Sequence, residues 1–200
     1  CVSGDTGSAT TVALIGDSHA AMWAPAFQQL ATGHGWRLET LTKMGCPVMS
    51  LHTPSPFRSL VEAVEHCRLW GEEILNRLRA DPPRLVVVSV WRGYGTAESL
   101  SGFTSYDTAW LDGLTRLVRE LRATEARVLV LGGALDPHVD VPICLSGHPG
   151  AVAACVRERA VAVNAAGIVA EEAATESAGG QYADLTELFC TADRCPVNRG

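Results

Sequence analysis

Residues Thr11–Trp23, TVALIGDSHAAMW, carry the chain from an apolar run into an amphipathic one. Val12–Ile15 is short and apolar throughout, which is typical of a strand buried on both faces of a sheet. Ala20–Leu30 has apolar residues at helical spacing and is predicted to be a helix. Ser18 therefore lies on a sharp turn from strand to helix, at the end of the helix where backbone N–H groups lack intrahelical partners.

The turn Gly16-Asp17-Ser18 has two interpretations. A hydroxyl in the first helical turn projects from the carboxyl end of the sheet, where free N–H groups and the helix dipole favour negative charge. Ser18 is therefore well placed to be an acyl-transfer nucleophile. The alternative is structural: Asp17 or Ser18 is an ordinary N-cap, and Gly16 is the residue that the turn requires. This stretch alone does not distinguish the two.

Composition and charge limit the function classes. The 200 residues, 47% of them hydrophobic, suffice for one globular domain with a full core. A net charge of -6 with scattered basic residues excludes a nucleic-acid footprint, and no apolar stretch is long enough to span a membrane. Residues 1–9, CVSGDTGSA, are small and polar and are predicted to be the end of a linker, which leaves 10–200 as a single domain.

Strand-like and helix-like segments alternate along the chain. The predicted strands after the first are 36–42, 85–90, 128–131 and 182–188; the predicted helices are 59–79, 106–124 and 151–174; loops are predicted at 43–57, 134–149 and 189–200. This order predicts an α/β fold, a three-layer α/β/α domain with a five-stranded parallel sheet. Ligands of such folds bind outside the carboxyl ends of the strands. That edge would collect Gly16–His19, the loop around Gly45, Trp91–Gly95 and the loop after Gly132.

The turn after the first strand is not a nucleotide-binding motif. GDSHAA lacks the GxGxxG of Rossmann folds, and neither a P-loop nor the GxSxG elbow of α/β-hydrolases occurs in the chain. No cofactor is therefore predicted. A flavodoxin-like domain with an unrelated ligand stays open as a structural alternative.

The seven cysteines indicate whether the protein works in an oxidising or a reducing compartment. None forms a CxxC pair, and their spacings match no zinc ribbon or finger. Proximity in sequence suggests three local pairings, each stapling a loop to a neighbouring element: Cys46–Cys67, Cys144–Cys155 and Cys190–Cys195, with Cys1 left over. The alternative is a reduced cytosolic protein with buried thiols. Seven cysteines, mostly beside proline and glycine in loops, favour an oxidising compartment.

Five short segments occur in order along nearly the whole chain. They are GDSHA at Gly16–Ala20, GCP at Gly45–Pro47, Trp91 after LVVVSV, PIC at Pro142–Cys144 and CTADRCPV at Cys190–Val197. In these segments the chain resembles the SGNH (GDSL-like) hydrolase family. It is most similar to the SGNH domain at the carboxyl end of bacterial membrane-bound acyltransferase-3 proteins, which O-acylate envelope glycans. The resemblance implies an SGNH-hydrolase, flavodoxin-like architecture.

The resemblance also implies roles for single residues. Ser18 matches the nucleophile, and its own N–H and that of Gly45 match two donors of the oxyanion hole. Glycine suits this task because no Cβ blocks the approach of an oxyanion, although Gly45 can equally be a plain turn glycine. The implied function is extracytoplasmic transfer of an acetyl or short acyl group to or from a cell-envelope glycan or glycolipid. The implied partners are that glycan and an N-terminal transmembrane acyltransferase domain of the same parent chain.

The third family block departs from its usual pattern. The family supplies an asparagine there, whereas this chain has VWRGYG without one. Trp91 is a candidate to stack on a sugar ring, with core packing as the alternative. Arg92 is a candidate donor to an oxyanion or an acidic sugar, with a solvated surface position as the alternative. Asp17 and His19 are further candidates for substrate binding, since both adjoin Ser18.

The fourth family block, Asp-x-x-His, occurs nowhere in these 200 residues. We expect the general base and its aspartate to lie beyond Gly200, and the domain to be truncated before that block. The competing hypothesis is a catalytically inactive module that binds glycan and presents it to a membrane acyltransferase domain. His138, beside Asp136 and Asp140, is the best internal substitute for the base, with a solvated loop position as the alternative. The same cluster is a weak pattern for a metal, and no metal is predicted.

Overall fold

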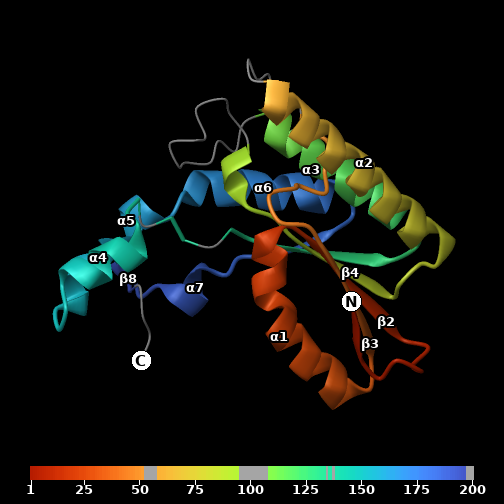
Figure 1. Cartoon of the computed structure of the whole chain (residues 1–200), viewed down its shortest axis with the longest axis horizontal. Helices are drawn as coiled ribbons and strands as arrows, with labels where there is room; N and C mark the ends of the chain where they lie inside the picture. The colour runs from red at the N-terminus through yellow and green to blue at the C-terminus, as the bar shows by residue number, and fades with distance from the viewer. Residues whose placement is uncertain (52–57, 95–107, 134, 137, 197–200) are drawn as a thin grey trace.

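The computed structural model describes residues 1–51, 58–94, 108–133, 135–136 and 138–196 (Figure 1). Its centre is a six-stranded sheet in the order β1-β3-β2-β4-β5-β7. The strands are β1 (Val2–Gly4), β2 (Thr11–Gly16), β3 (Arg37–Thr42), β4 (Leu85–Ser89), β5 (Arg127–Leu131) and β7 (Gln181–Ala183). All except β1 run parallel to their neighbours, so the five predicted strands and their parallel pairing are confirmed.

The first residues of the chain do not behave as a linker. Val2–Gly4 forms the antiparallel edge strand β1, in which Val2 pairs with Glu39 of β3. The amino terminus donates a hydrogen bond of 2.9 Å to the carbonyl oxygen of Thr40. Polar composition misled the prediction because an edge strand is held by backbone hydrogen bonds and needs little apolar surface. The sheet therefore has six strands, not five.

Helices cover both faces of the sheet, as the three-layer prediction requires (Figure 1). The larger helices are α1 (Ser18–His34), α2 (Arg58–Ala80), α3 (Thr108–Arg122) and α6 (Ala165–Ser177). Successive residues of β2 point to opposite faces: Ala13 and Ile15 join the core under α2 and α3, whereas Val12 and Leu14 join the core under α1. Both faces of the strand are thus buried, which explains its continuous apolar run.

The carboxyl-terminal third of the chain differs from its prediction. The expected helix 151–174 is broken into four elements: η3 (Val152–Cys155), β6 (Arg157–Glu158), α5 (Arg159–Ala162) and α6. The predicted loop 134–149 contains α4 (Val141–Gly147), and the predicted strand 182–188 ends at Ala183, before α7 (Thr186–Phe189). The small strand β8 (Arg194–Cys195), within the segment expected to be a loop, pairs with β6. Pairing with a distant segment interrupts the helix, which its alanine and valine content alone would favour.

The three predicted disulfides are present. Cys46–Cys67 ties the loop after β3 to α2, Cys144–Cys155 joins α4 to η3, and Cys190–Cys195 closes the turn before β8. Cys1 is exposed and carries a free thiol. Among the helices in the described ranges, none is long and apolar enough to cross a membrane.

Candidate functional site

Gly16 makes the sharp turn between β2 and α1 possible. Its φ angle is +142°, and a Cβ at this position would lie 1.8 Å from the carbonyl oxygen of Ser89 at the end of β4. Only glycine permits backbones to approach this closely. Gly16 also accepts a hydrogen bond from the N–H of Lys43, 3.1 Å away, just after β3. The ends of three strands therefore meet at this glycine.

Asp17 holds the turn from inside the protein. Its side chain is fully buried, and its Oδ1 accepts from the N–H of His19 at 2.8 Å, which caps α1. Its Oδ2 accepts from the N–H of Trp91 at 2.8 Å, and the Tyr94 side chain also hydrogen-bonds to it. Asp17 was expected to bind substrate, and this expectation is wrong, because the carboxylate has no exposed surface.

The surroundings of Asp17 keep it ionised. Burial alone raises the pKa of a carboxyl group, but nearby donors outweigh burial and hold the pKa of Asp17 below its usual value. These donors are the His19 ring, the N–H groups of Trp91 and His19, and the Tyr94 hydroxyl. Burial, followed by the charge of Asp17, raises the pKa of Tyr94, so its phenol stays protonated and can donate.

Ser18 is the first residue of α1 and is half-buried. Its place in the first turn puts it among the free N–H groups of the helix, as predicted. His19, also half-buried, follows it about 100° around the helix, so it is poorly placed to take the Ser18 proton. The His19 Nδ1 is buried and lies 3.6 Å from the Oδ1 of Asp17, so this edge of the ring faces the carboxylate.

Gly45 lies in the exposed turn that follows β3. Its φ angle is +69°, and a Cβ there would meet no atom within 4 Å. The turn is closed by a 3.1 Å hydrogen bond from the N–H of Cys46 to the carbonyl oxygen of Lys43. Gly45 is thus required by backbone conformation and not by close packing, in contrast to Gly16.

Trp91 and Arg92 follow β4 and have opposite environments. Trp91 is 38% exposed and packs edge-on against Tyr94, with ring centroids 5.2 Å apart, so it is not a core residue. Arg92 is only 6% exposed and forms a buried ion pair with Glu171 of α6. The expectation that Arg92 contacts substrate, and its alternative of a solvated arginine, are both wrong. Glu171 itself was missed, because its one signal in the sequence is an acidic residue within an alanine-rich helix.

One protein family matches this domain over its whole length. The family model for the SGNH domain (fused to AT3 domains) matches residues 1–200. The chain belongs to this family. One similar solved structure is the periplasmic domain of a lipopolysaccharide acetyltransferase from Salmonella ser. Paratyphi A, with a TM-score of 0.70 and 13% identity over 98% of this chain and 74% of that chain. At this identity the likeness establishes the fold alone, and a search of proteins with curated functions gives no significant match.

Asp136 and Asp140 of this SGNH domain accept hydrogen bonds within local turns. Asp140 caps α4 by accepting from the N–H of Ile143 at 3.0 Å, and Asp136 accepts from the N–H of His138 at 2.8 Å. In the described part of the chain, the group with metal-ligand spacing is instead formed by Cys144, His148 and Cys155. Its two sulfur atoms are joined in a disulfide and are therefore not available as thiolate ligands.

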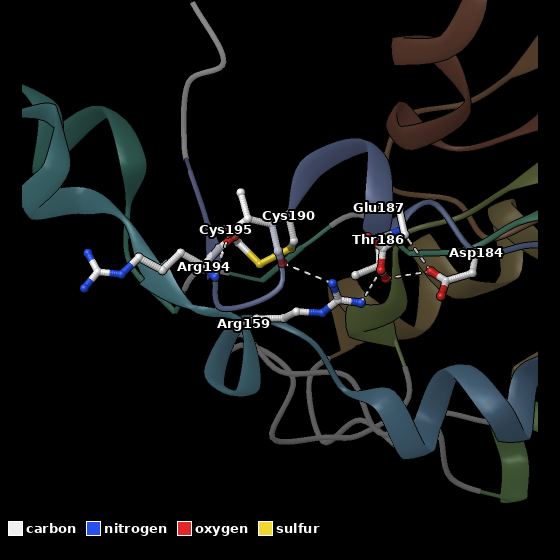
Figure 2. Close-up of a disulfide and its surroundings, with 8 residues drawn as sticks. Arg159, Asp184, Thr186, Glu187, Cys190, Arg194 and Cys195 are labelled. Carbon is white, nitrogen blue, oxygen red and sulfur yellow. Dashed lines mark hydrogen bonds and ion pairs between the residues drawn. A yellow bond between two sulfur atoms is a disulfide. The ribbon is translucent and has the colours of Figure 1, made fainter.

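An open groove of about 810 Å³ lies between α5, α6, α7 and β8 of the SGNH domain. It mixes aliphatic side chains such as Ile168 with charged ones such as Asp184. Arg159 of α5 lines this groove; it donates to Glu187 of α7 at 2.5 Å (Figure 2) and to the carbonyl oxygen of Thr191 at 3.1 Å. The groove begins where β7 ends, on the edge of the sheet that also carries Ser18.

Proposed function

We propose that this domain is the extracytoplasmic, serine-dependent part of an O-acyltransferase, which moves an acetyl or short acyl group to or from a cell-envelope glycan or glycolipid. The observation that carries the proposal is the position of Ser18 in the first turn of α1, on a turn whose backbone is fixed by Gly16 and Asp17. Such a position offers a hydroxyl together with free N–H groups.

The chemistry follows from the groups at this turn. The Ser18 hydroxyl oxygen attacks the carbonyl carbon of the acyl donor, and its proton passes to a general base. The N–H groups of Ser18 and Gly45 stabilise the negative oxygen of the tetrahedral intermediate. Collapse of that intermediate expels the donor's leaving group and leaves an acyl ester on Ser18. A sugar hydroxyl, or water, then attacks the ester and regenerates the serine.

The general base is proposed to lie outside these 200 residues. No Asp-x-x-His sequence occurs in the chain, and His19 follows Ser18 about 100° around helix α1, which places it poorly to take the hydroxyl proton. We therefore assign the base and its orienting aspartate to residues that follow Gly200 in the parent protein. His138 is a weaker candidate, since it is an exposed loop residue whose contact with Asp136 belongs to a local turn.

The setting of the domain is part of the same proposal. The family is described by its fusion to AT3 domains, so a membrane acyltransferase domain of the same parent chain is the proposed partner. Three disulfides suit an oxidising compartment outside the cytoplasm. Trp91 is partly exposed and lies beside the turn Gly16-Asp17-Ser18, the serine turn. It offers an aromatic face on which a sugar ring of the acceptor can stack.

The second candidate is a catalytically inactive module that binds glycan and presents it to the membrane domain. Two observations favour it: the third block, Val90–Gly95, has no asparagine, and the fourth block is missing from these 200 residues. The undisturbed GDSH turn favours the enzyme.

Hydrolysis of p-nitrophenyl acetate distinguishes the two candidates. The test compares the domain extended past Gly200 with its Ser18→Ala variant and with Ser177→Ala, a matched change at an exposed serine on α6. An enzyme loses its activity to background with Ser18→Ala, typically by 10³-fold or more, and keeps it with Ser177→Ala. Equal background rates for all three proteins would overturn simple esterase chemistry and favour the glycan-presenting module.

A further inference from the structure

A buried ion pair lies directly behind the serine turn. Arg92, in η1 (Arg92–Tyr94), donates to Glu171 of α6 through Nε at 3.0 Å and through Nη2 at 2.8 Å. Glu171 is fully buried, and its carboxylate also accepts from the indole N–H of Trp110 at 2.8 Å and from the hydroxyl of Tyr182 at 2.7 Å. The carboxylate is thus surrounded by donors from three separate elements.

The same arginine fastens the ends of two strands. Its Nη1 donates to the carbonyl oxygen of Val90 at 2.6 Å, just after β4, and its Nη2 donates to the carbonyl oxygen of Leu131 at 2.8 Å, at the end of β5. Its guanidinium also lies 5.8 Å from the centre of the Trp110 ring. The position of the backbone at Val90–Arg92 is therefore determined from inside the protein.

This backbone segment in turn supports the serine turn. Trp91 lies between Val90 and Arg92, and its N–H donates to Asp17 at 2.8 Å. Tyr94, at the other end of η1, supplies a second bond to the same carboxylate. Asp17 precedes Ser18 and caps its helix. Hydrogen bonds and short stretches of backbone therefore connect Glu171, through Arg92, Trp91 and Asp17, to the candidate nucleophile.

We propose that Arg92 and Glu171 are positioning residues for Ser18. By holding the segment after β4 they orient the Trp91 N–H and the Tyr94 hydroxyl toward Asp17, and Asp17 sets the direction of the Ser18 backbone. Neither residue touches the substrate. The effect on catalysis rests on the function proposed above, whereas the structural connection does not.

A double variant that removes both charges can separate a positioning role from a purely structural one. A buried ion pair adds little net stability over an uncharged pair, although breaking it from one side is costly. The double variant Arg92→Met/Glu171→Gln removes the ion pair and leaves no unpaired charge. The glutamine still offers an acceptor to the Trp110 indole and a donor to Tyr182. This variant is therefore expected to fold, even if each single variant does not.

The test compares this double variant with Arg79→Met/Glu120→Gln. The control removes another Arg–Glu pair, with Nη2 and Oε2 3.1 Å apart, between α2 and α3. In the domain extended past Gly200, we expect kcat for p-nitrophenyl acetate to fall by about 10- to 100-fold in the first variant with little change in KM, because misplaced reacting groups lose rate. The control is expected to keep wild-type kcat. Equal kcat values in both double variants would overturn the proposal.

Amide hydrogen exchange gives a second readout that needs no activity. Removing Arg92 and Glu171 is expected to accelerate exchange at the N–H groups of Trp91 and His19, the two backbone donors to Asp17, while exchange in β2 stays slow. Unchanged protection at these two amides would overturn the proposal, as would faster exchange with unaltered kcat. A wild-type domain without Ser18-dependent activity would overturn the proposed function, and amide exchange alone would then decide whether the connection exists.

Discussion

The body of the domain and its outer lobe are held together in different ways. The body comprises the six-stranded sheet with α1, α2, α3 and α6, and it buries continuous apolar clusters on both sides of the sheet. The lobe comprises residues 138–163 and 186–196, and its small cluster centres on Ala162, Cys190 and Cys195. Two of the three disulfides lie in the lobe. Apolar packing therefore stabilises the body, whereas disulfide bonds take over that role in the lobe.

The difference teaches where substitutions are tolerated. In the body, side chains and backbone fill the space around each residue, so a single added or removed carbon is costly. In the lobe, many side chains face solvent; Ile143 of α4, for example, is 69% exposed. The candidate nucleophile lies on the body side of this division, at the point where α1 leaves the sheet.

The largest expected difference in stability comes from replacing one glycine in each region with alanine. Gly16→Ala forces a Cβ to 1.8 Å from the Ser89 carbonyl at a positive φ, so we expect a loss of more than about 4 kcal/mol or failure to fold. Gly150→Ala in the lobe has a φ of +83° but meets no atom within 4 Å, so only the conformational cost of about 1 kcal/mol remains. Urea unfolding measures both. Similar losses would contradict the contrast between body and lobe.

Leucine truncation probes the packing itself. Leu14 in β2 is completely buried, and Leu14→Ala is expected to cost about 3 kcal/mol, from lost burial and the cavity left behind. Leu188 in α7 is 57% exposed, and Leu188→Ala should change stability by less than about 0.5 kcal/mol. Chemical denaturation of the two variants checks the difference. A cost above 1 kcal/mol for Leu188→Ala, on the order of a buried contact, would show that the lobe depends on packing after all.

Removal of a lobe disulfide should act locally. The loop closed by Cys190–Cys195 is short, so Cys190→Ser/Cys195→Ser is expected to cost about 2 kcal/mol. We expect that cost in local opening of the lobe, seen as faster amide exchange around β8, while exchange in β4 and β5 stays at the wild-type rate. Uniformly faster exchange across the sheet would mean that lobe and body unfold as one unit.

The smallest expected effect is a pH-dependent change in stability that distinguishes two aspartates, each of which caps a helix. Asp17→Asn replaces a buried acceptor of two backbone N–H groups with a side chain that also donates, and we expect a loss of about 1 kcal/mol at pH 7. Because the pKa of Asp17 is lowered in the folded protein, its stabilisation is complete above the unfolded pKa, near 4, and is lost as the pH falls through the folded value. The difference between wild type and variant should therefore shrink in acid.

The control for this pH test is Asp140→Asn in the lobe. Asp140 is exposed and caps α4 through one N–H, and asparagine caps a helix about as well as aspartate, so little change is expected at any pH. A series of urea midpoints between pH 3 and pH 7 compares both variants with wild type. A pH-independent loss for Asp17→Asn would show that its charge does not contribute.

The accuracy of the sequence-based predictions follows the same division. Strands β2 to β5 and helices α1 to α3 were predicted to within a few residues, because burial imposes periodic apolar patterns that are visible locally. The lobe was predicted poorly. Its break at Val156 adjoins the Cys144–Cys155 disulfide and the pairing of β6 with β8, and neither leaves a periodic pattern.

The sequence alone determined the succession of strands and helices in the body and the strand-to-helix turn at Ser18, and it suggested the three cysteine pairings, since each depends on residues that are near one another in the chain. Tertiary structure alone decided what the polar residues around that turn do. Asp17 is buried because strands β2 and β4 meet there, and Arg92 is an internal ion-pair partner because α6 brings Glu171 against it from 79 residues away. Burial and pairing of charges depend on which distant segments come together, and no local pattern records that.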